Sequence, residues 1–162
     1  MKTKTINIYQ FNELSEQAKQ KAMEWYLAGE DYSFAWECIV DDAKNVGLTI
    51  KQLDDHKFNK GFFVLSASDT ANKILVNHGE SCETYKDAKE YLEKVVFIRS
   101  SQLDESEMES ELEELEKDFL HLLLEDYRIM LNRDIEYLQS DTCVIESIEA
   151  NEYEFLENGE RA

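Results

Sequence analysis

Residues 104–138 read DESEMESELEELEKDFLHLLLEDYRIMLNRDIEYL. Apolar residues recur here every three or four positions, which places them along one side of an α-helix. At 1.5 Å per residue the predicted helix is roughly 50 Å long, so we expect it to bend, to project, or to break near Asn132. Its apolar seam consists of Met108, Leu112, Leu115, Phe119, Leu122, Leu123, Tyr127, Met130, Leu131, Ile135 and Leu138.

The first half of this predicted helix is crowded with carboxylates. Between Asp104 and Asp118 there are nine Asp or Glu residues and one base, Lys117. Like charges one turn apart destabilise a helix by a few tenths of a kcal/mol per pair, and helices that are merely soluble usually mix both signs. On a helix these acids flank the apolar seam as two stripes, a first stripe of Glu105, Glu109, Glu113 and Glu116 and a second stripe of Glu107, Glu111, Glu114 and Asp118.

We predict that these eight carboxylates bind a partner. A solvated face on an acidic protein is the simpler interpretation of an isolated charge run. A second acidic cluster near the C-terminus brings the two interpretations close to equal weight. It comprises Glu146, Glu149, Glu152, Glu154, Glu157 and Glu160.

The net charge of the chain, −19, is unevenly distributed. Residues 1–100 contain 13 Lys or Arg and 16 Asp or Glu, whereas residues 101–162 contain 4 and 20. Such asymmetry indicates a partner that is basic or that normally binds nucleic acid. Direct binding to DNA or RNA is disfavoured, because that affinity depends on Lys and Arg neutralising phosphates.

Length and composition favour one folded domain over residues 1–162. Apolar content of 43% argues against disorder, and no apolar run approaches the roughly 20 residues of a membrane span. The N-terminus lacks the apolar core of a signal peptide. Three widely spaced cysteines, Cys38, Cys82 and Cys143, suit reduced thiols. We therefore expect a cytoplasmic protein without membrane contact.

The remaining segments predict an α+β fold, a small antiparallel sheet of about four strands packed with about six helices. Helix caps are expected at Ser15, at Ser68 or Asp69, and at Ser140-Asp141, with stops at Gly29, Gly47 and Gly79. Expected helices cover residues 16–29, 33–46, 69–76, 84–99 and 141–148 besides the long one, and expected strands cover 3–11, 48–53, 61–66 and 153–155.

His78 and Cys82 are the one pair that suggests catalysis or zinc binding. A histidine and a cysteine four positions apart can act as base and nucleophile, or as two zinc ligands. A structural zinc site needs four ligands, however, and two glutamates adjoin Cys82, where a thiolate needs a positive setting. The simpler interpretation is a helix-to-helix connection with Gly79 at its turn. We expect no catalytic residues, no metal and no cofactor.

Three segments resemble a family of small acidic phage and prophage proteins that carries the label antitoxin of a toxin–antitoxin stability system. They are Tyr9-Gln10-Phe11-Asn12-Glu13-Leu14-Ser15 with Ala18-Lys19, Asn77-His78-Gly79-Glu80 with Cys82-Glu83-Thr84-Tyr85, and Ile148-Glu149-Ala150-Asn151-Glu152-Tyr153-Glu154-Phe155. The resemblance covers most of the chain and brings no functional residues with it. It implies a mobile genetic element, a setting in which small acidic proteins often block host nucleic-acid machinery.

These observations predict a phage-type inhibitor rather than an enzyme. Its acidic surface would mimic nucleic acid and occupy the basic nucleic-acid-binding groove of a host protein, as an anti-CRISPR or other anti-defence protein does in the host cytoplasm. The alternative is an antitoxin or assembly subunit that binds a partner protein, or forms a homodimer, through the apolar seam of the long helix. A hydrolase or metal enzyme centred on His78 and Cys82 is the third hypothesis.

Overall fold

The computed structural model describes residues 6–54 and 58–162. The chain resolves into two compact units. We call the unit formed by Phe34–Asn132 the central unit, and the unit formed by the residues up to Ser33 together with Arg133–Ala162 the terminal unit. That residues 1–162 fold together as one domain stays a prediction.

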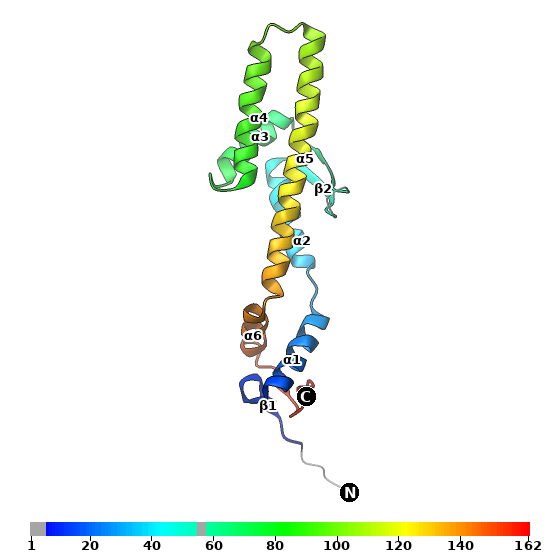
Figure 1. Cartoon of the computed structure of the whole chain (residues 1–162), viewed down its shortest axis with the longest axis vertical. Helices are drawn as coiled ribbons and strands as arrows, with labels where there is room; N and C mark the ends of the chain where they lie inside the picture. Colours follow the sequence, from blue (N-terminus) through cyan, green and yellow to red (C-terminus); the bar gives the residue numbers. More distant parts are fainter. Residues whose placement is uncertain (1–5, 55–57) are drawn as a thin grey trace. The chain divides into compact units, whose positions relative to one another are not determined.

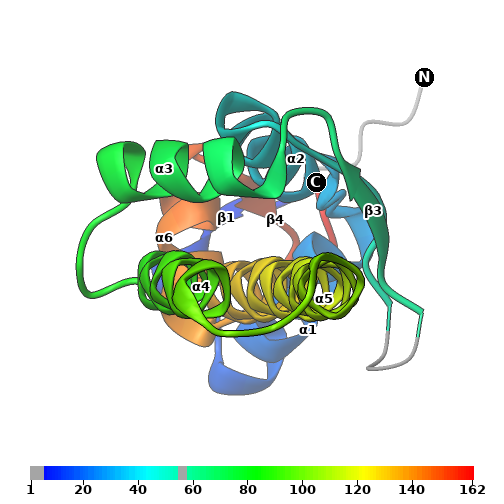
Figure 2. The same cartoon turned by 90° about the horizontal axis from the view of Figure 1, so that it is seen from above.

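The described part of the central unit contains a β-hairpin and four helical segments. Its strands pair antiparallel, with Leu48 opposite Phe63. Two of its helices, α4 and α5, lie side by side as the arms of a helical hairpin, and α3 packs on α4 (Figures 1 and 2). The elements are α2 (Ser33–Val46), β2 (Leu48–Gln52), β3 (Lys60–Phe63), α3 (Ala67–Asn77), α4 (Glu83–Ser100) and α5 (Glu105–Leu138) as far as Asn132.

A glycine makes the sharp turn from α2 into β2. Gly47 has a φ of +93°, in the left-handed region that side-chain-bearing residues rarely adopt. A Cβ added there would stand 2.6 Å from Cδ1 of Leu65. The backbone angle therefore requires glycine at the end of α2, whereas the exposed side chain of Leu65 could move aside for a Cβ.

The ring of Phe119 joins three elements of the central unit. Phe119, on α5, is 1% exposed. Its ring centroid lies 4.3 Å from that of Tyr91 on α4 and 5.8 Å from that of Phe63 on β3, with nearly parallel planes in both cases. This stack fixes the lower part of the α4–α5 hairpin against the β2–β3 hairpin.

The terminal unit brings the two ends of the described chain together. Its elements are β1 (Tyr9–Gln10), the 3₁₀ helix η1 (Phe11–Glu13), α1 (Glu16–Gly29), α6 (Asp141–Ala150) and β4 (Glu154–Phe155). β1 pairs antiparallel with β4, and α1 packs against α6. The core is formed by Phe11, Leu14, Ala18, Ala22, Met23, Val144, Ile148 and Phe155.

Most predicted helices are confirmed. Six α-helices occur within the described residues, and the longest, α5, has 34 residues and runs through Asn132 without a break. Ser15 caps α1 by accepting a hydrogen bond from the Ala18 amide, and Ser140 caps α6 by accepting one from the Cys143 amide. The predicted caps at Ser68 or Asp69 are wrong. Ser66 is the N-cap of α3, because its hydroxyl accepts from the Asp69 amide.

The prediction of one sheet of about four strands is wrong in its connectivity. The described residues form two separate two-stranded antiparallel sheets, β1–β4 and β2–β3. Each sheet belongs to a different unit, so the four strands have no common edge along which to pair. The α+β class itself is confirmed.

The strand predicted for residues 3–11 is shortened to Tyr9–Gln10. Residues 3–5 of that prediction lie outside the described part of the chain. Ile6 and Ile8 alternate as a strand would, but they precede β1 and are 58% and 54% exposed. The partner strand β4 has only two residues for pairing. Residues 55–57, in the connection between the strands predicted at 48–53 and 61–66, lie outside the described residues.

All three cysteines are free thiols. Cys38 and Cys82 are exposed, and Cys143 is half-buried. Among the helices of the described residues, none combines the length and the apolar character that crossing a membrane requires.

Candidate functional site

The eight predicted binding residues all lie exposed on the first four turns of α5. The helix begins with a reciprocal cap, in which Asp104 accepts a hydrogen bond from the Glu107 amide at 2.9 Å and Glu107 accepts one from the Asp104 amide at 3.3 Å. Among the described residues, these eight carboxylates make one ion pair, between Glu113 and Lys117 at 4.0 Å. The surface is therefore strongly negative and almost uncompensated.

The two stripes differ in their surroundings. Glu111, Glu114 and Asp118 of the second stripe border a hollow of about 300 Å³ between α4 and α5. The other residues that line this hollow are Lys94, Phe97, Ile98 and Leu115. The second stripe thus borders a groove, whereas the first stripe projects from the other flank of the apolar seam.

A smaller hollow of about 100 Å³ continues this groove along the same two helices. It shares Lys94, Leu115 and Asp118 with the larger one and extends to Asp87 and Leu122. Its remaining lining residues are Glu90, Tyr91 and Phe119. We call the two hollows together the α4–α5 groove.

Most of the apolar seam of α5 is buried or half-buried against other parts of the chain. Phe119, Leu123, Tyr127 and Leu131 are buried. Met108, Leu112 and Leu115, nearer the start of the helix, are half-buried. Leu122 is the exception at 47% exposed, and it lies at the end of the α4–α5 groove.

Two carboxyl groups face each other between α4 and α5. Burial, the charge of Asp87 and a hydrogen bond with Asp87 raise the pKa of Asp126 to about 7. Burial also raises the pKa of Asp87. In the described part of the chain, no group donates a hydrogen bond to the buried Oδ2 of Asp126. The pair is therefore most stable when Asp126 carries a proton and donates it to Asp87.

His78, whose side chain is buried, lies at the centre of a polar network that reaches the partly exposed Asp42. Its Nδ1 is 2.7 Å from the hydroxyl oxygen of Thr84, and its Nε2 is 3.3 Å from Oδ2 of Asp42. The hydroxyl of Tyr127 donates to the same carboxylate oxygen at 2.9 Å. Thr84 and Tyr127 are fully buried. The network links α2, the end of α3, the start of α4 and α5.

His78 and Cys82 are not arranged as a base and a nucleophile. Both ring nitrogens of His78 face Asp42 and Thr84, and neither is directed at Cys82. Cys82 is exposed and is the N-cap residue of α4, with no side-chain capping hydrogen bond. Among the described residues, no group of three or more His, Cys, Asp or Glu side chains could hold a metal ion.

Replacing Tyr127 with phenylalanine is expected to lower the free energy of unfolding by about 1–2 kcal/mol, because the charged Asp42 loses a hydrogen-bond donor. Urea unfolding curves measure this difference. Tyr137→Phe is the matched control, because it removes the same hydroxyl from a side chain of α5 that is 63% exposed. Equal stability of the two variants would contradict a role for the network.

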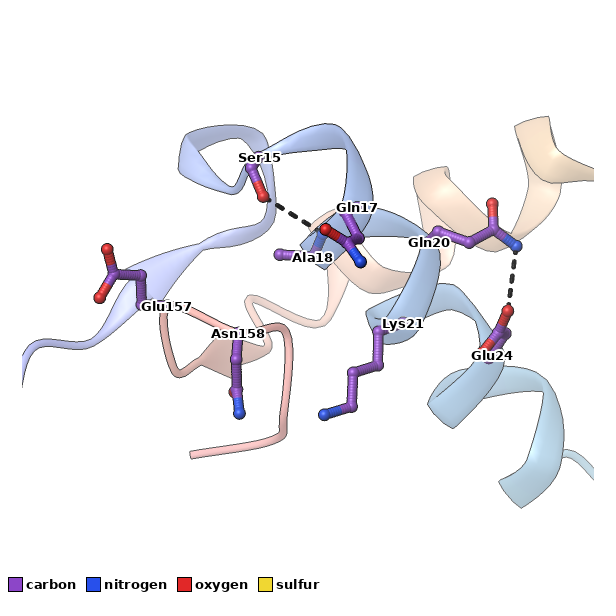
Figure 3. Close-up of a pocket in the computed structure, with 8 residues that line it drawn as sticks. All are labelled: Ser15, Gln17, Ala18, Gln20, Lys21, Glu24, Glu157 and Asn158. Atoms are coloured by element: carbon purple, nitrogen blue, oxygen red, sulfur yellow. Dashed lines mark hydrogen bonds between the residues drawn. The ribbon is translucent and has the colours of Figure 1, made fainter.

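A hollow of about 700 Å³ lies in the terminal unit, between α1 and the C-terminal turn (Figure 3). Its lining is polar, and several of its side chains already have partners. Ser15 caps α1, Gln20 donates to Glu24 at 3.3 Å, and Lys21 pairs with Glu160 at 2.9 Å.

Sequence reasoning missed the residues that α4 contributes to the groove, above all Asp87, Lys94 and Phe97. On α4, Val96 is 68% exposed, whereas Ile98 is buried. The spacing of Asp87, Glu90, Lys94 and Phe97 places these residues on one face of a helix, which is the available signal. The pattern does not reveal that this face meets α5.

No protein-family model, curated protein or solved structure matches the chain in comparisons with known proteins. The candidate site is therefore defined by its geometry and charge alone.

Proposed function

We propose that this protein is a non-enzymatic inhibitor that binds a host nucleic-acid-binding protein through the acidic half of α5. The observation that carries the proposal is the exposure of all eight carboxylates, of which Glu113 alone forms an ion pair within the described residues. Carboxylates one turn apart repeat at about 5–6 Å along the helix axis, so they present a regular negative row to a basic groove. Such a row can replace the phosphates that the groove normally binds.

The inhibitor would act in the cytoplasm of a bacterial host. The resemblance to acidic phage and prophage proteins supports an anti-CRISPR or other anti-defence role, in which the partner is the nucleic-acid-binding component of a defence complex. Mimicry of DNA by the protein surface needs no bound nucleic acid, no metal and no cofactor. Attraction between opposite charges also accelerates association.

The alternative proposal, an antitoxin or assembly subunit that docks through the apolar seam, has less support. Four buried residues of the seam are already packed inside the chain: Phe119, Leu123, Tyr127 and Leu131. Leu122 is the one exposed residue of the seam, so a partner that docked on the seam alone would have little apolar surface to cover. The exposed carboxylates on the same helix favour binding through the acidic surface instead.

Salt dependence tests the proposed function. The protein is immobilised, a bacterial lysate is passed over it, and the retained protein is challenged with rising salt. Between about 0.1 M and about 1 M the screening length falls from about 10 Å to about 3 Å, so we expect at least a tenfold loss of retained partner. An excess of duplex oligonucleotide should also release the partner, because both compete for one groove.

A neutralised variant provides the local control. Replacing the seven glutamates of the two stripes with glutamine, and Asp118 with asparagine, should abolish retention of the partner. Neutralising the C-terminal cluster instead should have little effect; that control set is Glu146, Glu149, Glu152, Glu154, Glu157 and Glu160. Retention that is insensitive to salt, or lost equally in both variants, would contradict the proposal.

A further inference from the structure

The α4–α5 groove combines an apolar floor with acidic walls. Leu115 lies on the floor of both hollows, with Ile98 and Tyr91 contributed by α4. Phe97 lines the larger hollow and is 74% exposed. An exposed phenylalanine beside a groove is a feature of binding surfaces, because its apolar area stays in water until a partner covers it.

The walls of the groove carry a large excess of negative charge. Five carboxylates line it against one base, Lys94, which is already 2.7 Å from Glu90. Three of the carboxylates come from α5 and two from α4. They are Asp87, Glu90, Glu111, Glu114 and Asp118. An occupant must therefore be cationic as well as partly apolar.

The length of the groove matches a short helix. On α5 its lining runs from Glu111 to Leu122, which corresponds to about 16 Å or three helical turns. Residues 111, 115, 118 and 122 follow the i, i+4, i+7 and i+11 spacing of one helical face. A third helix laid along this face would bury its own apolar stripe against Phe97, Leu115 and Leu122.

We propose that the α4–α5 groove binds a basic amphipathic helix of the partner protein, with apolar side chains on the floor and Lys or Arg side chains against the carboxylate walls. This inference rests on the proposed function and adds a binding mode to it, a helix in a groove. Two other occupants fit less well. Nucleic acid would be repelled by the walls, and a second copy would bring another net charge of −19 to the same surface.

A synthetic peptide of leucine and lysine tests the groove directly. The peptide has about four helical turns, with leucines at i, i+3, i+4 and i+7. A scrambled peptide of identical composition has the same charge but no apolar face. By isothermal titration calorimetry with the full chain, the amphipathic peptide should bind at least tenfold more tightly than the scrambled one.

Matched variants assign the binding to the groove. Glu111→Lys with Glu114→Lys should weaken binding of the amphipathic peptide about tenfold, whereas Glu146→Lys with Glu149→Lys, an equal charge change at exposed positions of α6, should weaken it less than threefold. Phe97→Ser should also weaken it about tenfold, and Val96→Ser, at a neighbouring exposed position, should not. Circular dichroism checks that all four variants stay helical.

The outcomes separate this inference from the proposed function. Equal binding of both peptides, or equal weakening by both charge-reversed pairs, would overturn the groove while leaving salt-sensitive attraction intact. Failure of both peptides to bind even at low salt would also overturn the groove, whereas salt-sensitive retention of a lysate protein tests the proposed function separately. A dimer in light scattering that Phe97→Ser converts to a monomer would show that a second copy occupies the groove, which also overturns the inference.

Discussion

Replacing Phe119 with alanine is expected to lower the free energy of unfolding of the central unit by about 3–5 kcal/mol. The ring is 1% exposed and stacks on Tyr91 and Phe63 from two other elements. Its removal leaves a cavity at the point where α4, α5 and β3 meet. The loss of one buried ring should therefore loosen the α4–α5 groove as well as the core.

Urea unfolding followed by the fluorescence of Trp36 measures this effect in the central unit. The chain has two tryptophans, so a Trp25→Phe background leaves Trp36 as the single reporter. Phe119→Leu is the graded control and should cost less than about 1.5 kcal/mol, because it retains most of the apolar volume. A loss below about 1 kcal/mol for Phe119→Ala would mean that the aromatic stack does not hold the hairpin.

The helices could be predicted because their signals are local. Serine caps and glycine stops act within one turn, and the apolar period of α5 extends over all of its 34 residues. The eight carboxylates could be placed on an exposed helix for the same reason. The cap of α3 was misplaced because Ser66, Ser68 and Asp69 are all good N-cap residues, and only the hydrogen bond at the Asp69 amide distinguishes them.

The sheets and the groove depend on contacts between distant segments, which a local pattern does not contain. The two-residue strands β1 and β4 are too short for any alternation to predict their pairing. The α4–α5 groove requires that Phe97 and Glu111 come from neighbouring arms of a hairpin. Likewise, nothing in the spacing of Asp42, Thr84 and Tyr127 indicates that they converge on His78.

The acidic surface and the core of the central unit are connected through α5. Carboxylates on its first turns line the groove, and further along the same helix Asp126 meets Asp87 between α4 and α5. Negative charge is therefore present inside the hairpin as well as on its surface. The internal pair makes the stability of the hairpin depend on pH.

Replacing Asp126 with asparagine is expected to stabilise the central unit above pH 7 by about 2 kcal/mol. The folded pKa of Asp126, about 7, lies above its ordinary value of 3.8. Between these values the folded chain holds a proton that the unfolded chain releases, so stability is highest below about pH 4 and falls as pH rises through 7. Each pKa unit corresponds to 1.36 kcal/mol, and the half-buried position of Asp126 reduces the total through solvent screening.

Urea unfolding from pH 4 to pH 8 tests the role of this buried proton, again with Trp36 as reporter. Asparagine keeps a donor for the Asp87 carboxylate without any need for protonation, so the variant should lose most of the decline in stability seen in the parent. Asp118→Asn removes the same charge from an exposed position on the same helix, and its profile should stay parallel to that of the parent chain. If Asp126→Asn and Asp118→Asn give the same pH profile, the carboxyl pair does not share a proton, and the pH dependence arises from the surface charge instead.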